Sequence, residues 1–212
     1  MFPEPTNVVL IFYGLQAATA LIVAVILRKF YKTYKNNYFQ YWYWSWMALA
    51  FLMLGSIIAL VNVFTLDQHH PFRITVSALN IALGLTQFFW LFAGSYELSL
   101  AKKFDGRRFA IYTALVIPIS LVLTFSFINN PELSAERIFM RVGIKSLVGS
   151  MAFITSAVLI YKLRHVGIGM KVIIISFLLY GLEQFFYFMI SLSSVVDILN
   201  MSLEFPYYIG AF

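Results

Sequence analysis

Six apolar runs, each close to the roughly 20 residues that a helix needs to cross a bilayer, constrain this chain more than any other feature. Of the 212 residues, 61% are hydrophobic and only 11% are charged, which is much more apolar than a soluble domain. The sequence therefore predicts an all-α fold, a polytopic membrane helix bundle. Its predicted spans cover residues 8–27, 43–64, 74–98, 109–128, 138–163 and 172–192.

A seventh span is expected to begin at Pro206 in the stretch EFPYYIGAF, because proline is favoured in the first turn of a helix. Only six residues follow this proline in the sequence, which are too few to cross a membrane. We therefore expect a single transmembrane domain over residues 1–212, with six complete spans and the start of a seventh.

The distribution of lysine and arginine predicts the orientation of the bundle. Loops after the first, third and fifth predicted spans are basic, whereas the alternate loops together contain five acidic and two basic residues. The positive-inside rule then places the basic loops in the cytoplasm and the N-terminus outside, in the inner (plasma) membrane. The net charge of +6 follows from this loop bias, so no nucleic-acid partner is expected. The basic loop residues are Arg28, Lys29, Lys32, Lys35, Lys102, Lys103, Arg107, Arg108, Arg164 and Lys171.

The stretch YFQYWYWSWM, residues 38–47, follows the first basic loop and contains seven aromatic residues. Tryptophan and tyrosine concentrate where a bilayer meets water, because the ring is apolar and the N–H or O–H stays hydrated. We interpret the stretch as an aromatic belt at the cytoplasmic interface. The spacing of four between Tyr34, Tyr38, Trp42 and Trp46 predicts that these rings share one helical face.

Polar residues within the predicted spans are the candidate functional residues, because each is costly in hydrocarbon unless it is paired or hydrated. Arg141 and Lys145 lie on one face of the fifth predicted span, and span depth predicts that Lys145 meets Glu183 of the sixth. These groups either bond to one another and fix the bundle, or surround a cavity for an anionic or carbonyl-bearing ligand. The candidate ligand-binding set is Arg141, Lys145, Glu183, Gln184, Asn80, Gln87, Trp90 and Tyr187.

One local repeat supports a second hypothesis. GLTQFFW at 84–90 and GLEQFFY at 181–187 lie 97 residues apart in the third and sixth predicted spans. Three helices separate the copies, so the two halves would have opposite orientations, as in transporters built from inverted repeats. A small transporter is therefore the alternative function, although few identities extend beyond these seven positions and chance resemblance also explains them.

The sequence gives little support for enzyme chemistry. It contains no HExxH, GxSxG or Walker motif, and no pair of aspartates within a span. The chain also lacks cysteine. We expect no enzymatic activity, no cofactor and no metal site.

At the level of organisation, the chain resembles the N-terminal seven-helix membrane sensor modules that bacteria fuse to histidine kinases or diguanylate cyclases. The features that carry the resemblance are the outside N-terminus, the short loops, the segment RKFYKTYKNNYFQYWYWSWMALAFLMLG and the closing PYYIGAF. The resemblance implies signal transduction through a cytoplasmic C-terminal output domain, as in a two-component system. Together with the polar residues of the spans, this organisation leads us to expect a homodimeric receptor. Its small amphipathic or lipid-like ligand would bind in the outer half of the bundle, where those polar residues lie.

Overall fold

The computed structural model describes residues 4–65, 70–100, 111, 114–116, 118–120 and 142–196. Its long helices are α1 (Glu4–Tyr34), α2 (Asn37–Thr65), α3 (Pro71–Leu100), α6 (Ile144–Ile160) and α7 (Ile168–Val196), and the short 3-10 helix η3 (Tyr161–Leu163) follows α6. The described residues contain no strand. The predicted all-helical class is therefore confirmed.

Within the described residues, five helices are long and apolar enough to cross a membrane, which is what a polytopic membrane protein requires. They correspond to five of the six predicted spans. The remaining predicted span, 109–128, lies mostly outside the described residues. Pro206, where a seventh span is expected to begin, lies wholly outside them.

The turn between α1 and α2 changes one prediction about the aromatic residues. Lys35 has a positive φ of 58°, the left-handed conformation that commonly ends a helix, and its N–H donates to the carbonyl of Tyr31 at 2.8 Å. Tyr34 therefore ends α1, whereas Tyr38, Trp42 and Trp46 belong to α2. The prediction that all four rings share one helical face is wrong for Tyr34, because the chain reverses between it and the others.

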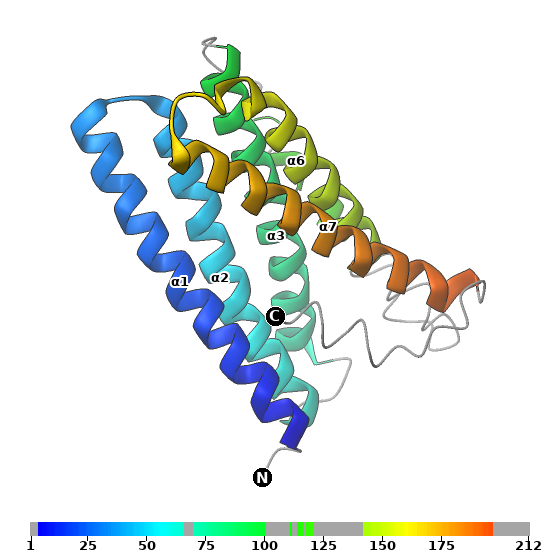
Figure 1. Cartoon of the computed structure of the whole chain (residues 1–212). Helices are drawn as coiled ribbons and strands as arrows, with labels where there is room; N and C mark the ends of the chain where they lie inside the picture. Colours follow the sequence, from blue (N-terminus) through cyan, green and yellow to red (C-terminus); the bar gives the residue numbers. More distant parts are fainter. Residues whose placement is uncertain are drawn as a thin grey trace.

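The helices pack in chain order: α1 against α2, α2 against α3, α3 against α6, and α6 against α7 (Figure 1). Neighbours run antiparallel except for α3 and α6. Contacts between these two join Gly84 to Lys145, Phe88 to Gly149 and Ser99 to Leu159, with 60 or 61 positions between the partners of each pair. A constant offset means that α3 and α6 are parallel, as expected if the predicted fourth span crosses between them.

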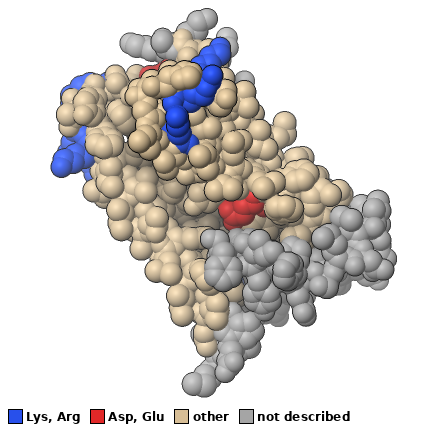
Figure 2. Space-filling view, viewed as in Figure 1, with Lys and Arg blue, Asp and Glu red and all other residues tan. Residues whose placement is uncertain are grey.

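The described core lies toward one end of the bundle, near the connections α1–α2 and α6–α7. There Trp42 of α2 meets Phe177 of α7 edge to face, with ring centroids 6.0 Å apart, and its Nε1 donates to the Leu91 carbonyl at 3.3 Å. Figure 2 shows the blue Lys and Arg atoms of this view gathered at the same end. We call it the basic end, and the half of the bundle farther from it the distal half. The core residues are Leu27, Trp42, Phe88, Leu91, Phe153, Ala157, Ile160, Ile174 and Phe177.

Small residues allow the helices to approach one another, as is usual where lipid removes any hydrophobic drive for helix association. A β-carbon on Gly149 would lie 2.6 Å from Cζ of Phe88, and one on Gly181 would lie 2.8 Å from Cγ1 of Ile154. Large apolar side chains such as Ile22 and Leu179 are instead exposed on the outer surfaces. The helices thus bury small residues and present apolar side chains outward, as suits a lipid environment.

Candidate functional site

The distal half of the α2–α3 interface contains polar atoms that lack partners. Asn80 of α3 lies directly on Gly55 of α2, where the absence of a side chain makes room for its amide. Within the part of the chain that the structure describes, three buried atoms have no hydrogen-bond partner here: Asn62 Nδ2, Ser77 Oγ and Asn80 Oδ1. Ser77 lies one turn from Asn80 on α3, and Asn62 lies two turns from Gly55 on α2. We call Asn62, Ser77 and Asn80 the distal polar seam.

Lys145 adjoins this seam from α6. A β-carbon on Gly84 would lie 2.8 Å from Cδ of Lys145 and 3.4 Å from its Cγ, so the aliphatic part of the lysine rests on the glycine. Gly84 is one helical turn from Asn80, which places Lys145 within a turn of the seam. Arg141, the other predicted cation, lies outside the described residues.

Gln87 and Trp90 belong to the packing between α2 and α3, nearer the basic end than Asn80. Gln87 is buried, and its backbone carbonyl accepts a hydrogen bond from Ser45 Oγ at 2.9 Å. Trp90 stacks on Tyr41, with ring centroids 5.5 Å apart and planes inclined at 27°. The structure therefore packs Trp90, a candidate ligand-binding residue, against Tyr41 of α2.

Glu183, Gln184 and Tyr187 are partly buried on α7, which packs mainly on α6, whereas the seam lies between α2 and α3. Gly181 packs on Ile154, and the rings of Phe153 and Tyr180 stack with centroids 5.4 Å apart. Counting from these contacts along antiparallel helices, Glu183 is level with residues 151–152 of α6, about 10 Å along the axis from Lys145. The pairing of Lys145 with Glu183 that span depth predicts is not supported by this register.

Of the predicted residues, the structure thus brings together Asn80 and Lys145. Asn62 and Ser77 complete the described group and were absent from the predicted set. Asn62 carried a signal, since it is an amide inside a predicted span. Ser77 carried none, because serines are common in buried helix interfaces of this chain.

The two copies of the local repeat have different surroundings. Gly84 and Gly181 both pack against α6, whereas an inverted three-helix repeat requires Gly84 to contact α2 in the way that Gly181 contacts α6. Phe88 is 3% exposed, but its counterpart Phe185 is 41% exposed. This packing does not support the transporter hypothesis, which stays a prediction.

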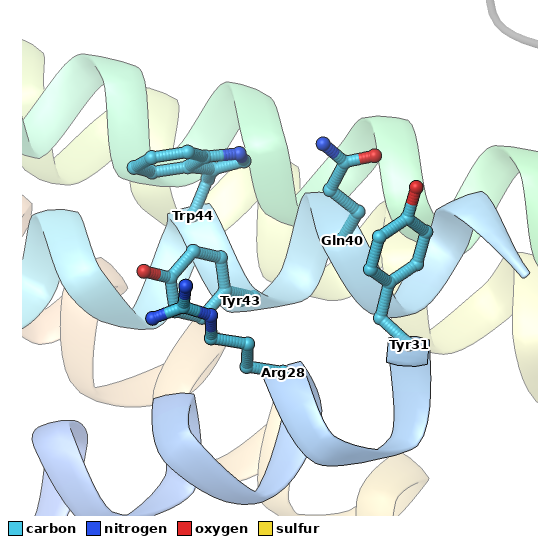
Figure 3. A pocket seen from close by; sticks show the side chains of 5 residues that line it. All are labelled: Arg28, Tyr31, Gln40, Tyr43 and Trp44. Carbon is cyan, nitrogen blue, oxygen red and sulfur yellow. The ribbon is translucent and has the colours of Figure 1, made fainter. Parts of the chain in front are cut away.

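A second site lies near the basic end between α1 and α2. Part of it belongs to the stretch 38–47, which the sequence predicts to be an aromatic belt. The site is a cavity of about 230 Å³ lined by Arg28, Tyr31, Gln40, Tyr43 and Trp44 (Figure 3). The spacing of Gln40, Tyr43 and Trp44 could have indicated it, because positions i, i+3 and i+4 share a helix face.

Metal binding finds no support in the described residues, where no three His, Asp or Glu side chains lie close enough to hold an ion. Comparison with known proteins adds no assignment: no family model, no curated protein and no solved structure matches this chain.

Proposed function

We propose that this chain is a membrane-embedded sensory module that binds a small amphipathic molecule in the distal half of the bundle. The carboxylate or carbonyl head of this molecule lies beside Lys145 and the distal polar seam, and its tail lies in the apolar surroundings. Orientation by the positive-inside rule would make this the outer half of the membrane.

The observation that carries the proposal is the group of unpaired buried atoms beside a cation. A buried polar atom without a hydrogen bond costs about 1–3 kcal/mol, and the seam contains three such atoms in the described structure. A polar head group beside Lys145 would accept a hydrogen bond from Ser77 Oγ. Asn62 lies about 10 Å farther along the helix axis than Asn80, as counted from the contact of Asn80 with Gly55, and is too far away for the same head group. A hydroxyl or amide on the same ligand would donate to Asn80 Oδ1.

Lys145 supplies the charge for an anionic head. Its stem is held against Gly84, and the ammonium group follows at the end of that stem. The positive charge of this ammonium group attracts a carboxylate, and such attraction is stronger away from water than in it. The alternative is that these polar residues serve only to hold the helices together. In that case Asn62 Nδ2, Ser77 Oγ and Asn80 Oδ1 would be expected to form hydrogen bonds with neighbouring helices.

The relay to the cytoplasmic side would run through α6. This helix begins beside the seam and ends at Ile160, which belongs to the core that joins Trp42 and Phe177. A ligand that draws Lys145 away from Gly84 changes the α3–α6 contact at one end. Because α6 is a continuous helix, a displacement at that end reaches the core near the basic end, where an output domain would connect.

The test titrates dodecanoate, a single-chain carboxylate, into protein purified in a maltoside detergent and follows thermal unfolding. Dodecanol serves as the head-group control. We expect dodecanoate to stabilise wild type and to bind about tenfold more weakly to Lys145→Met and Asn80→Leu. Arg141→Ala is compared in parallel.

The matched control is Lys171→Met, which removes one lysine charge from an exposed position near the basic end. This variant should respond to dodecanoate like wild type. If Lys145→Met and Asn80→Leu also respond like wild type, or if dodecanol stabilises as well as dodecanoate, the distal polar seam is not the ligand site.

A further inference from the structure

The cavity near the basic end is built from the last turns of α1 and the first turns of α2. Arg28 and Tyr31 come from α1, and Gln40, Tyr43 and Trp44 come from α2. The Arg28 guanidinium carbon lies 6.0 Å from the centroid of the Tyr43 ring, within the range of a cation–π contact. In Figure 3 the Tyr31 hydroxyl and the Gln40 amide point to the same side of the two helices.

The chemistry of the lining selects an anion. Arg28 is a permanent cation with five N–H donors, and Tyr31, Gln40, Tyr43 and Trp44 each add at least one neutral donor. No carboxylate lines the cavity. A guanidinium fork with nearby hydroxyl and amide donors is suited to the tetrahedral oxygens of a phosphate.

Exposed apolar side chains continue from the cavity toward the middle of the helices. On α1, Val25 lies one turn before Arg28 and is 66% exposed. On α2, Phe51 lies two turns after Trp44, and these two side chains are 52% and 43% exposed. The surface therefore has a polar, cationic head region and an apolar region that extends away from it along both helices.

From this arrangement we propose that the cavity binds the phosphate of an anionic phospholipid whose acyl chains lie along Val25 and Phe51. A free phosphate would use only the head region and would leave the apolar region unexplained. Net negative head groups are favoured because Lys29 and Lys32, both exposed, are on the same turns of α1 as Arg28 and Tyr31. The site lies at the opposite end of the bundle from the distal polar seam and does not depend on it.

The test measures lipid binding by the full chain in maltoside detergent, with dioleoyl phosphatidylglycerol, dioleoyl phosphatidylcholine and inorganic phosphate as probes. Thermal unfolding reports the binding of each. We expect phosphatidylglycerol to stabilise wild type most. Arg28→Gln should bind it about tenfold more weakly, as expected for the loss of a charged hydrogen bond.

The matched control is Lys29→Gln, which removes an adjacent positive charge that does not line the cavity. It should keep most of the preference for phosphatidylglycerol. Equal losses in Arg28→Gln and Lys29→Gln would mean that the basic surface attracts anionic lipid diffusely, and would overturn the site. Stabilisation by inorganic phosphate equal to that by phosphatidylglycerol would overturn the lipid assignment.

Tryptophan quenching gives a second measurement that does not depend on unfolding. Phosphatidylglycerol with brominated acyl chains should quench the fluorescence of wild type more than that of Trp44→Phe, because Trp44 lines the cavity and is exposed. The difference should shrink in Tyr31→Phe/Gln40→Ala, which keeps Arg28 but removes two donors. Equal quenching in wild type and Trp44→Phe would contradict lipid binding at this position.

Discussion

Lys145 of α6 rests its aliphatic chain on Gly84 of α3, with its Cδ 2.8 Å from the position that a β-carbon on residue 84 would occupy. Four residues further along both helices, the same offset brings Gly149 of α6 against the ring of Phe88 of α3. The two parallel helices therefore approach through one glycine from each. A flexible lysine covers the first glycine and a packed ring covers the second.

This difference predicts unequal costs for enlarging the two glycines. Gly149→Ala places a methyl group 2.6 Å from the buried Phe88 ring, which cannot move without disturbing the core, so we expect a loss of about 1–3 kcal/mol. Gly84→Ala meets the Lys145 side chain, which can rotate away, so its loss should be smaller. Chemical or thermal unfolding in detergent compares the two variants.

Gly14→Ala is the control, because nothing lies within 4 Å of a β-carbon at that position of α1. It should be neutral or slightly stabilising, since alanine favours a helix over glycine. A Gly84→Ala variant that is less stable than Gly149→Ala would contradict the proposed difference between the two contacts.

The aromatic stretch at the start of α2 provides a second comparison within three residues. Trp42 is buried, contacts Phe177 and donates a hydrogen bond to the Leu91 carbonyl, whereas Trp44 is 43% exposed. We expect Trp42→Phe to lower thermal stability clearly, by about 1–3 kcal/mol for the unpaired carbonyl and altered packing. Trp44→Phe should leave stability in lipid-free detergent nearly unchanged. Equal losses of stability in Trp42→Phe and Trp44→Phe would contradict the difference between a buried Trp42 and an exposed Trp44.

The spans could be predicted from sequence because they depend only on the length and polarity of a run. Helix rotation could not be predicted in the same way. GLTQFFW and GLEQFFY differ at two of their seven positions, yet Phe88 is buried against Gly149 while Phe185 faces outward. The surroundings of each copy come from residues on neighbouring helices, which the short repeat does not specify.

The candidate site was only partly predictable for a related reason. Depth from the end of a span placed Lys145 and Glu183 at similar levels, but the contact of Gly181 with Ile154 sets the register of α6 and α7 and separates them. The Asn80–Gly55 contact depends on a glycine on a different helix. Such pairings are fixed by small residues that carry no functional signal of their own.

The register of α6 and α7 predicts that the charges of Lys145 and Glu183 interact only weakly. Breaking a buried contact pair costs about 3–5 kcal/mol, because one charge remains uncompensated. With about 10 Å between their levels along the axis, Lys145 and Glu183 should couple by about 1 kcal/mol or less. Stabilities of Lys145→Met, Glu183→Gln and the double variant give the coupling energy. A value of several kcal/mol would place the two side chains in contact.

The two ends of the bundle can be assigned to the two sides of the membrane by cysteine labelling, because the native chain contains no cysteine. Asn36 and Gly167 are exposed and lie in the α1–α2 and α6–α7 connections, at the basic end, while His70 is exposed in the α2–α3 connection at the opposite end. By the positive-inside rule, an impermeant thiol reagent applied to intact cells should label His70→Cys but not Asn36→Cys or Gly167→Cys. Permeabilised cells control for accessibility, since all three variants should then react.

Labelling of Asn36→Cys and Gly167→Cys in intact cells, with His70→Cys protected, would reverse the orientation and place the distal polar seam on the cytoplasmic side. Labelling of Asn36→Cys without Gly167→Cys would contradict the packing of α1, α2, α6 and α7, which puts both connections at one end.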